Sequence, residues 1–417
     1  MKRDVLIVGG GAAGMLCAIA VKMQNPERRA LILEKNDRVG KKLLATGNGR
    51  CNLGNDNAAA ANYHSVAGDG ASFVMPALMK YPPAANREFF EALGLLVRSD
   101  EAGRQYPYTN QAAAALDILR LRLAALAVEV RADSQVVEIA KGSDGRFAVE
   151  TADGERYTAA KLVIATGGLA SPQISNSQGM ADVLRQLGHE SSGCFPALTQ
   201  VKTEGKLPKA LKGIRIPCAV TLYTAGAAAQ REEGELLFAD YGISGIPAFQ
   251  LSRRVSENFA RKSPQEQWVE IDALPQLAAA EITDLLLERR RTFDTTLEDF
   301  LVGVVNKKLG QQILKICGLA PLSRSCGSLN DDEILLAAHI LKHLRLNVSG
   351  ATGWKNAQVT AGGLLTADFS AETLESRLIP GLFAIGEALD IDGDCGGYNL
   401  TWAWSSARLA AESLAKD

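Results

Sequence analysis

The stretch Asp4–Gly14, with the sequence DVLIVGGGAAG, decides the fold. Its first five residues form a short apolar run, which suits a buried strand of a parallel sheet. The run ends in glycines, and residues 12–23 then have the composition of a helix. Residues 30–34, ALILE, form a second apolar run. Strand, helix and strand in this order predict a β-α-β unit, and therefore an α/β fold of the Rossmann type.

The glycines of this stretch follow the pattern Gly-x-Gly-x-x-Gly. Gly9 permits a tight turn, Gly11 lets a pyrophosphate approach the backbone, and Gly14 allows the helix to pack closely on the strand. The N-terminus of the helix offers N–H groups to phosphates. Glu34 follows Gly14 by twenty residues, where a carboxylate accepts hydrogen bonds from ribose and opposes a 2′-phosphate. We therefore expect a dinucleotide site that disfavours NADP. A glycine-rich turn in an unrelated α/β protein is the alternative.

The composition is that of a globular protein without an extreme charge. The chain has 417 residues, enough for two or three domains, and 45 basic against 47 acidic residues give a formal charge of −2. No global field therefore favours nucleic acid or a membrane. Seven scattered cysteines without a CxxC pair indicate thiols in a reducing compartment, and no zinc site.

The N-terminus has a second interpretation as a secretion signal. Lys2 and Arg3 precede an uncharged run, Val5–Val21, and residues 18–20 (AIA) resemble a cleavage site. The run is short and glycine-rich for a membrane span, and its glycine spacing has the explanation given above. No later segment is apolar enough to cross a bilayer, so we expect a cytoplasmic protein.

The sequence in the middle of the chain predicts helices, then a β-meander, and then a region of different composition with short strand-like runs. Amphipathic helices are expected at 86–96 and 111–126, and meander strands at 134–139, 146–151 and 161–165. The meander ends in ATGG, residues 165–168, and in many FAD proteins such a glycine end runs beside the dinucleotide; alone, it is any strand-to-loop turn. Short runs from 194 to 271 suggest a small barrel or sandwich, and residues 276–344 are mostly helical and rich in charge.

The C-terminal region contains a second glycine-rich segment. Residues 381–387, GLFAIGE, form a short strand ending in Gly386, and the chain then passes Asp390 to reach GGYN at 396–399. A closing helix is expected from about Trp402, and its N-terminus would stabilise negative charge on a reduced flavin. A glycine-rich N-terminus with a distant Gly-Glu strand favours one FAD domain split around an insertion.

A third segment, GKKLLATGNGRCN at 40–52, lies just beyond Glu34. Lys42 and Arg50 would balance phosphate charge. The small polar side chains that would face the isoalloxazine are Asn48, Cys51 and Asn52. A solvated basic loop is the alternative for the lysines, but the density of glycine and asparagine favours close approach of the backbone to a ligand.

Four long blocks resemble one flavoprotein family. They are KKLLATGNGRCNLGN (41–55), LLFADYGISG (236–245), AQVTAGGL (357–364) and GLFAIGEALDIDGDCGGYNLTWAWSS (381–406). The family is that of NAD(P)/FAD-dependent oxidoreductases, whose members have been named aminoacetone oxidases, dehydro-bile-acid reductases and ribosomal RNA dihydrouridine synthases. One departure is Ile246, which separates Gly245 from Pro247 where the usual pattern has Gly-Pro directly.

The resemblance implies FAD, a split Rossmann-type domain, an inserted β-barrel and a helical subdomain within that insertion. We place the FAD-binding domain at 1–192 and 359–417, the barrel at 193–274 and 345–358, and the helical subdomain at 275–344. The residues expected at the FAD site from the motifs and the resemblance are Gly9, Gly11, Ala12, Ala13, Gly14, Glu34, Lys35, Lys42, Thr46, Gly47, Asn48, Arg50, Cys51, Asn52, Val136, Val137, Ala165, Thr166, Gly167, Gly168, Gly386, Glu387, Asp390, Gly396, Gly397, Tyr398 and Asn399.

No proton donor stands out, and Cys51, Tyr398 and Tyr241 are the candidates. No metal site is expected, because His339 and His343 lack a third ligand. The first hypothesis is an enzyme that reduces an activated C=C bond of a small molecule, with NAD(P)H as a transient electron donor. The alternatives are oxidation of a small amine by oxygen, reduction of uridine in ribosomal RNA held by the basic helical insertion, and a binding protein with structural FAD. Substrate, donor and oligomeric state stay open.

Overall fold

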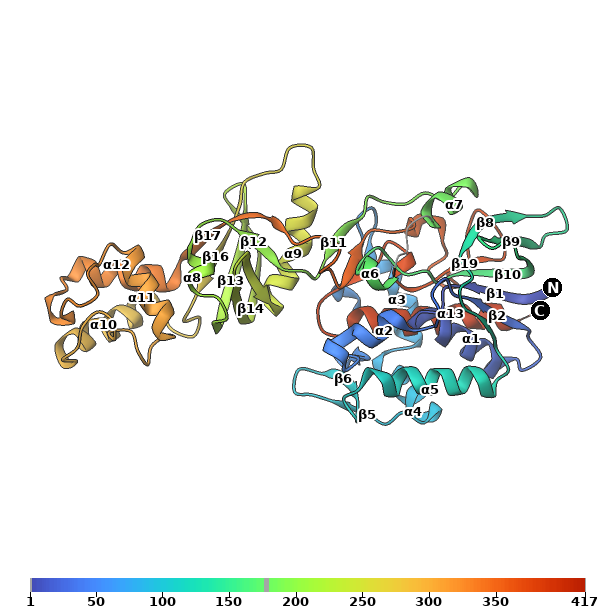
Figure 1. Cartoon of the computed structure of the whole chain (residues 1–417), viewed down its shortest axis with the longest axis horizontal. Coiled ribbons are helices and arrows are strands. Elements are labelled where there is room, and N and C mark those ends of the chain that lie inside the picture. The colour runs from blue at the N-terminus through green and yellow to red at the C-terminus, as the bar shows by residue number, and fades with distance from the viewer. Residues whose placement is uncertain (1, 176–179, 417) are drawn as a thin grey trace. The chain divides into compact units, whose positions relative to one another are not determined.

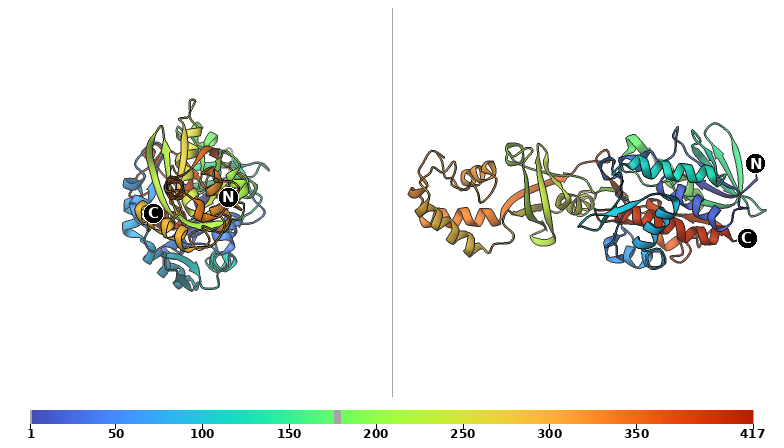
Figure 2. Two further views of the ribbon diagram at one scale, coloured as in Figure 1. Left: turned by 90° about the vertical axis from the view of Figure 1, so that its left-hand side faces the viewer. Right: turned by 90° about the horizontal axis from the view of Figure 1, so that it is seen from below.

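A computed structural model describes residues 2–175 and 180–416, and the chain divides into two compact units. The first unit contains residues 1–196 and 357–417, and the second contains residues 197–356. The chain leaves the first unit through strand β11 (Phe195–Ala197). Both chain ends are marked on the first unit in Figure 2. No helix among the described residues is long and apolar enough to cross a membrane.

The first unit is built on a mixed seven-stranded sheet, which confirms the predicted α/β, Rossmann-type fold class. Its strand order is β7-β2-β1-β10-β9-β8, and β19 pairs with the far end of β10. Five strands run parallel: β1 (Lys2–Val8), β2 (Ala30–Leu33), β7 (Glu129–Arg131), β10 (Arg156–Ile164) and β19 (Leu382–Ala384). The predicted meander is the antiparallel edge formed by β8 (Val136–Lys141), β9 (Phe147–Thr151) and the first half of β10.

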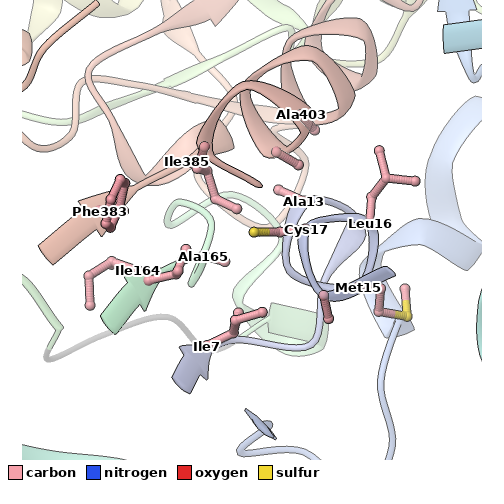
Figure 3. Packing of buried hydrophobic residues seen from close by; sticks show 14 of the residues in the cluster. Ile7, Ala13, Met15, Leu16, Cys17, Ile164, Ala165, Phe383, Ile385 and Ala403 are labelled. Carbon is pink, nitrogen blue, oxygen red and sulfur yellow. The ribbon is translucent and has the colours of Figure 1, made fainter. Parts of the chain in front are cut away.

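Helices α1 (Ala12–Gln24) and α13 (Tyr398–Ala415) pack against each other in this unit (Figure 1). Nine consecutive residues of α1, from Ala13 to Val21, are buried, because α1 lies between the sheet, α13 and α5 (Ala112–Ala125). Small side chains make the close contact possible: Figure 3 shows Ala13 of α1 facing Ala403 of α13 next to Ile385. A core of this kind, in which Ala13 and Ala403 are 390 residues apart in sequence, joins an N-terminal to a C-terminal segment.

Shorter elements complete the first unit. They are α2 (Lys41–Ala45), β3 (Gly54–Asn55), β4 (Tyr63–His64), α3 (Gly70–Lys80), α4 (Pro83–Leu93), β5 (Val97–Ser99), β6 (Arg104–Pro107), α6 (Pro172–Ser175), α7 (Met180–Gln186), β18 (Val359–Ala361) and β20 (Asp392–Gly393). The helix expected at 86–96 starts earlier, because Pro83 suits a first helical turn, and it ends at Leu93 before Gly94. The final helix starts at Tyr398, four residues before the expected position.

The second unit contains a closed antiparallel barrel, which decides between the barrel and the sandwich expected from sequence. The barrel order is β12-β15-β14-β13-β16-β17. The strands are β12 (Val201–Thr203), β13 (Arg215–Thr224), β14 (Ala227–Ala239), β15 (Gly242–Gly245), β16 (Gln267–Asp272) and β17 (Leu344–Ala351). Helices α8 (Leu207–Ala210) and α9 (Ile246–Phe259) also belong to this unit. The unusual Ile246 is the first residue of α9, so Pro247 lies in the first turn, where its missing N–H leaves no helical bond unmade.

Three further helices of the second unit share the barrel's hydrophobic core. They are α10 (Ala279–Thr292), α11 (Lys307–Ile316) and α12 (Asp331–Lys342). Buried residues of these helices, such as Leu286, Ile313 and Leu341, belong to one cluster with Val269 and Leu346 of the barrel. The helical part is therefore continuous in its packing with the barrel.

Candidate functional site: a dinucleotide cradle at the carboxyl ends of the strands

Of the three motif glycines after β1, two are packed and one is open. Gly9 has φ +109°, and an ideal Cβ there would lie 2.4 Å from the Ala165 carbonyl oxygen. A Cβ on Gly14 would lie 2.0 Å from the Gly9 carbonyl oxygen. At Gly11, by contrast, a Cβ would meet no described heavy atom within 4 Å. The start of α1 therefore presents open space and backbone N–H groups, as a phosphate requires.

The Glu34 carboxylate is held at the edge of this glycine loop. It is buried, and its Oε2 accepts a hydrogen bond from the Gly10 N–H at 2.7 Å, while Oε1 accepts from the Asn36 N–H at 2.9 Å. The chain just before β8 lies alongside, because Ser134 N–H donates to the Glu34 carbonyl at 2.8 Å. At the start of β8, Val136 is buried and Val137 is exposed. Burial lowers the pKa of Lys35, and the Glu34 charge opposes that shift.

The ends of β10 and β19 meet the same edge of the sheet. Ala165 N–H donates to the Val8 carbonyl at 2.9 Å, which places Thr166 and Gly167 beside the glycine loop. A Cβ on Gly168 would lie 2.3 Å from Thr360 Oγ1, so this position has room for glycine alone. Since ligands of open α/β sheets bind at the carboxyl ends of the strands, these segments define the candidate site.

Helix α13 fixes the turn that follows β19. The Gly386 N–H donates to Ser406 Oγ at 3.0 Å, and the Gly386 carbonyl accepts from Trp402 Nε1 at 3.0 Å. A Cβ on Gly386 would lie 3.1 Å from the Cβ of Ala13. The buried Trp402 side chain therefore packs in the core and also holds this turn.

An ion pair joins two predicted site residues that are far apart in sequence. Lys42 Nζ lies 2.7 Å from Glu387 Oε2, and both side chains are partly buried. The other oxygen of Glu387 accepts from the Thr360 N–H at 2.8 Å. The Lys42 ammonium, expected to balance phosphate charge, thus has a protein carboxylate as its partner.

The loop at 46–52 has an unusual backbone. Asn48 and Cys51 both have left-handed φ values, 54° and 58°, although they carry side chains. The Cys51 side chain is fully buried, and burial raises its pKa to about 12. A thiol in this state is a poor proton donor and nucleophile at neutral pH. Thr46 and Gly47 are partly buried, whereas Asn48 is exposed.

Two other residues of this loop differ in how they are held. Arg50 is exposed and lies over the Tyr106 ring, 5.1 Å from its centroid. Asn52 Oδ1 is buried and has no hydrogen-bond partner among the described residues. Since a buried acceptor without a donor is costly, this atom suits a site that a polar ligand completes.

A second helix N-terminus lies next to Asn52. Gly397 is the residue before α13 and has φ +106°, and its Cβ would lie 2.3 Å from the Gly54 carbonyl oxygen and 2.7 Å from Asn52 Oδ1. Gly396 precedes it with φ +128°. The Asn399 side chain holds the loop between β20 and α13, because its Nδ2 donates to the Gly393 carbonyl at 2.8 Å. Burial raises the pKa of Tyr398, and the Asp394 charge raises it further.

The structure describes two more of the residues named from sequence. The Asp390 side chain is fully buried, and its carboxylate accepts hydrogen bonds from the Ser65 hydroxyl at 2.8 Å and the Ala67 N–H at 2.9 Å. It is turned toward the loop that follows β4 and is not open to a ligand. Tyr241 belongs to the second unit, in the turn between β14 and β15, and is exposed.

The structure also shows a pair that the sequence interpretation did not include. His64 Nε2 lies 3.0 Å from Asp394 Oδ1, and both side chains are partly exposed. The pairing of the short strands β4 and β20 brings the two residues together: His64 ends β4, and Asp394, 330 residues away in sequence, directly follows β20. The only sequence signal was the scarcity of histidine, with four in the chain.

The observed sheet and the glycine loop after β1 define a Rossmann-type domain of the dinucleotide-binding class. The chain belongs to the HI0933-like family: the family model described as "HI0933-like protein Rossmann domain" matches residues 3–413. The members of this family to which the chain is similar are enzymes, and the chain is an FAD-dependent oxidoreductase, which confirms the prediction from sequence.

Two curated relatives span nearly the whole chain. The 3-dehydro-bile acid delta(4,6)-reductase of Clostridium scindens is 34% identical over 421 residues, covering 98% of each chain. The ribosomal RNA dihydrouridine synthase of Escherichia coli is 29% identical over 416 residues, covering 99% of this chain and 98% of the relative. Among solved structures, a quinol-fumarate reductase with menaquinol molecules has a TM-score of 0.51 at 16% identity, covering all of this chain and 71% of that one, which shows similarity of fold.

Proposed function

We propose that this enzyme reduces a C=C bond conjugated to a carbonyl group in a small molecule, with steroid-like acids as the first substrate class to test. The observation that carries the proposal is the 34% identity, over 98% of both chains, to a reductase of 3-dehydro bile acids. The dihydrouridine synthase supports the reaction type, because the uracil double bond that becomes saturated is also conjugated to a carbonyl.

The proposed cofactor contacts follow from the geometry. The open start of α1 at Gly11 would hold the pyrophosphate, and Glu34 would accept hydrogen bonds from the ribose. The start of α13 after Gly397 would face the pyrimidine edge of the flavin, where its N–H groups stabilise negative charge. Bound FAD supplies two-electron hydride chemistry at such a site. The orphaned Oδ1 of Asn52 lies beside this second helix start and fits a polar ligand.

NAD(P)H is the proposed electron donor. The sequence contains no second Gly-x-Gly-x-x-Gly with a following acid, so we propose that nicotinamide visits the flavin face without a domain of its own. The test is a visible spectrum of the purified protein, followed by anaerobic addition of NADH and then NADPH. Bleaching of the flavin band by either supports the proposal. A flavin that stays oxidised turns the search to amine substrates that deliver electrons themselves.

Reduction of uridine in ribosomal RNA is the second candidate, favoured by the 29% identity to a dihydrouridine synthase. The contacts of the basic helical segment support the RNA hypothesis less than the run of arginines in its sequence does, because these arginines already have partners in the protein. Arg289 donates to the Phe300 carbonyl at 3.0 Å, and Arg290 donates to the Leu329 carbonyl at 2.9 Å and pairs with Asp331. These arginines contact backbone and side-chain groups within the helical part, so their replacement would also affect its stability. Lys308 and Lys315 are exposed and are the sharper test. Replacing both with glutamine should weaken RNA binding and reduce its salt dependence if the RNA hypothesis holds.

A further inference from the structure

The His64–Asp394 pair is held rigidly on one side and open on the other. The Asp394 carboxylate accepts from Asn62 Nδ2 at 3.0 Å through the oxygen that does not contact His64. Its backbone N–H donates to the Asn62 carbonyl at 3.0 Å, and its carbonyl accepts from Asn399 Nδ2 at 3.3 Å. The His64 side chain keeps 39% of its surface exposed. The acid therefore fixes one ring nitrogen, and the imidazole retains access to solvent and to a ligand.

The pair lies against the first turn of α13. Asp394 precedes Gly397 by three residues, and the Tyr63 hydroxyl next to His64 donates to the Tyr398 carbonyl at 3.0 Å. The Asp394 charge reaches the Tyr398 ring, whose pKa it raises. The imidazole is thus placed by the same loop that forms the proposed flavin-facing helix start.

Burial raises the pKa of two of the three proton donors considered from sequence, and of a cysteine next to Asp394. Burial raises the pKa of Cys51 to about 12 and also raises that of Tyr398. Cys395, the residue after Asp394, has its pKa raised to about 11 by burial. Imidazole is the side chain that exchanges protons near neutral pH, and among general acids it is the most common.

We propose that His64 is the general acid of the reduction and that Asp394 is its positioning residue; this inference rests on the proposed function. In the reaction, the β carbon of the conjugated system gains a hydride, which carries two electrons from the reduced flavin. The α carbon gains a proton from the His64 imidazolium, and the C=C bond becomes a single bond. The neutral imidazole left behind regains its proton from water at its exposed edge. The sum is uptake of two electrons and two protons by the substrate.

The second unit offers a matched control. His343 Nδ1 lies 3.1 Å from Glu270 Oε1, and the exposed fractions of the two side chains are 42% and 26%, against 39% and 25% for His64 and Asp394. The two pairs therefore share chemistry and exposure, but His343 is at the end of α12 rather than beside α13. His343→Gln controls for the loss of any surface histidine held by a carboxylate.

The experiment separates proton transfer from the other steps. The FAD-loaded protein is reduced anaerobically with dithionite and mixed with a 3-oxo-4,6-diene bile acid, and reoxidation of the flavin is followed by stopped flow. We expect His64→Gln to slow this step by about 100-fold, the lower range for loss of a general acid. Reoxidation by ferricenium, which needs no protonation of carbon, should stay at the wild-type rate, and His343→Gln should match wild type with both oxidants.

A second measurement does not depend on turnover. Nitrogen-15 spectra of the imidazoles in the holoprotein, recorded at a pH where they are neutral and assigned by loss of signals in His64→Gln, should show His64 with its remaining proton on Nε2. Asp394→Asn should convert this to a mixture of tautomers and slow reoxidation by the dienone less than His64→Gln does.

The outcomes are distinct. Wild-type protein that no conjugated alkene reoxidises contradicts the proposed function, and the inference falls with it. Wild-type protein that the dienone reoxidises, with a His64→Gln variant that reacts equally fast, overturns the role of His64 alone. A His64→Gln variant that cannot hold FAD also overturns it, because the pair would then be structural.

Discussion

Helices α1 and α13 are both preceded by a glycine beside the proposed FAD site, but the space around these two glycines differs. Gly11 at α1 has open space where a side chain would be, whereas Gly397 at α13 is pressed against the Gly54 carbonyl, with only 2.3 Å for a Cβ. The first glycine leaves room for a ligand, and the second leaves room for the protein's own backbone. Substitution at the two positions should therefore separate binding from folding.

The largest effect is expected for Gly397→Ala. The substitution combines a left-handed φ of +106° with a backbone clash, so we expect a loss of about 3 kcal/mol of stability and loss of bound FAD. Urea unfolding of the variant measures the loss of stability, and its visible spectrum measures the loss of bound FAD. Gly145→Ala is the control, because Gly145 also has a positive φ, +77°, with no described atom within 4 Å of a Cβ. A Gly397→Ala variant as stable as Gly145→Ala would refute the packing role.

The next effect is expected for Gly11→Val, which should give folded apoprotein. A branched side chain at the start of α1 blocks the approach of the phosphates, so we expect FAD affinity to fall by at least about 100-fold, while unfolding of the apoprotein in urea changes by less than about 1 kcal/mol. Titration of apoprotein with FAD measures the affinity. A yellow variant with one FAD per chain would contradict the placement of the cofactor.

The stability of the protein should fall at alkaline pH, because one buried cysteine lies in or near the start of each of these two helices. Burial raises the pKa of Cys17 in α1 and of Cys51 beside the start of α13, both to about 12. An unfolded thiol loses its proton near pH 8.5 to 9, so above this pH the unfolded state binds fewer protons than the folded state, and stability falls as pH rises. Each thiol contributes up to about 1.4 kcal/mol per pH unit between about pH 9 and 12.

The measurement is urea unfolding of Cys17→Ala and Cys51→Ala at pH 8, 9 and 10. Each variant should depend less steeply on pH than wild type above pH 9. Equal slopes in all three proteins would show that these thiols ionise in the folded state.

The smallest effect is expected for the Lys42–Glu387 pair, which links the two halves of the site at 2.7 Å. Because both side chains are partly exposed, Glu387→Gln should cost about 1 kcal/mol or less, and the glutamine can still accept from the Thr360 N–H. A double-mutant cycle with Lys42→Met in apoprotein measures the coupling. Coupling that disappears when FAD is bound would indicate that Lys42 exchanges Glu387 for a phosphate.

The N-terminal half of the site could be predicted because its signals are local. Gly9, Gly11 and Gly14 sit at fixed spacing after an apolar strand, and Glu34 ends the next strand, so one β-α-β unit contains the whole pattern. The structure adds that Gly9 and Gly14 are required by backbone packing. The start of α13 was placed four residues late, since Tyr398 and Asn399 carry no strong helix signal.

The remainder of the site depends on contacts between distant segments. Nothing near Lys42 in the sequence indicates Glu387, and nothing near His64 indicates Asp394. Asp390 was expected to line the cofactor from its motif, yet its buried carboxylate serves the 65–67 loop, which only the fold brings to it. Such pairings are decided by strand partners, here β4 with β20.

By itself, the sequence determined the class of fold and the position of the Gly-x-Gly-x-x-Gly loop, because periodicity and motif spacing are properties of contiguous residues. FAD was indicated by the resemblance of four long blocks to one flavoprotein family. The tertiary structure alone decided which groups of the protein each of these carboxylates contacts. A side chain's direction and burial depend on what packs against it, and in this chain the partners are far apart in sequence: Gly9 packs against Ala165, and His64 against Asp394.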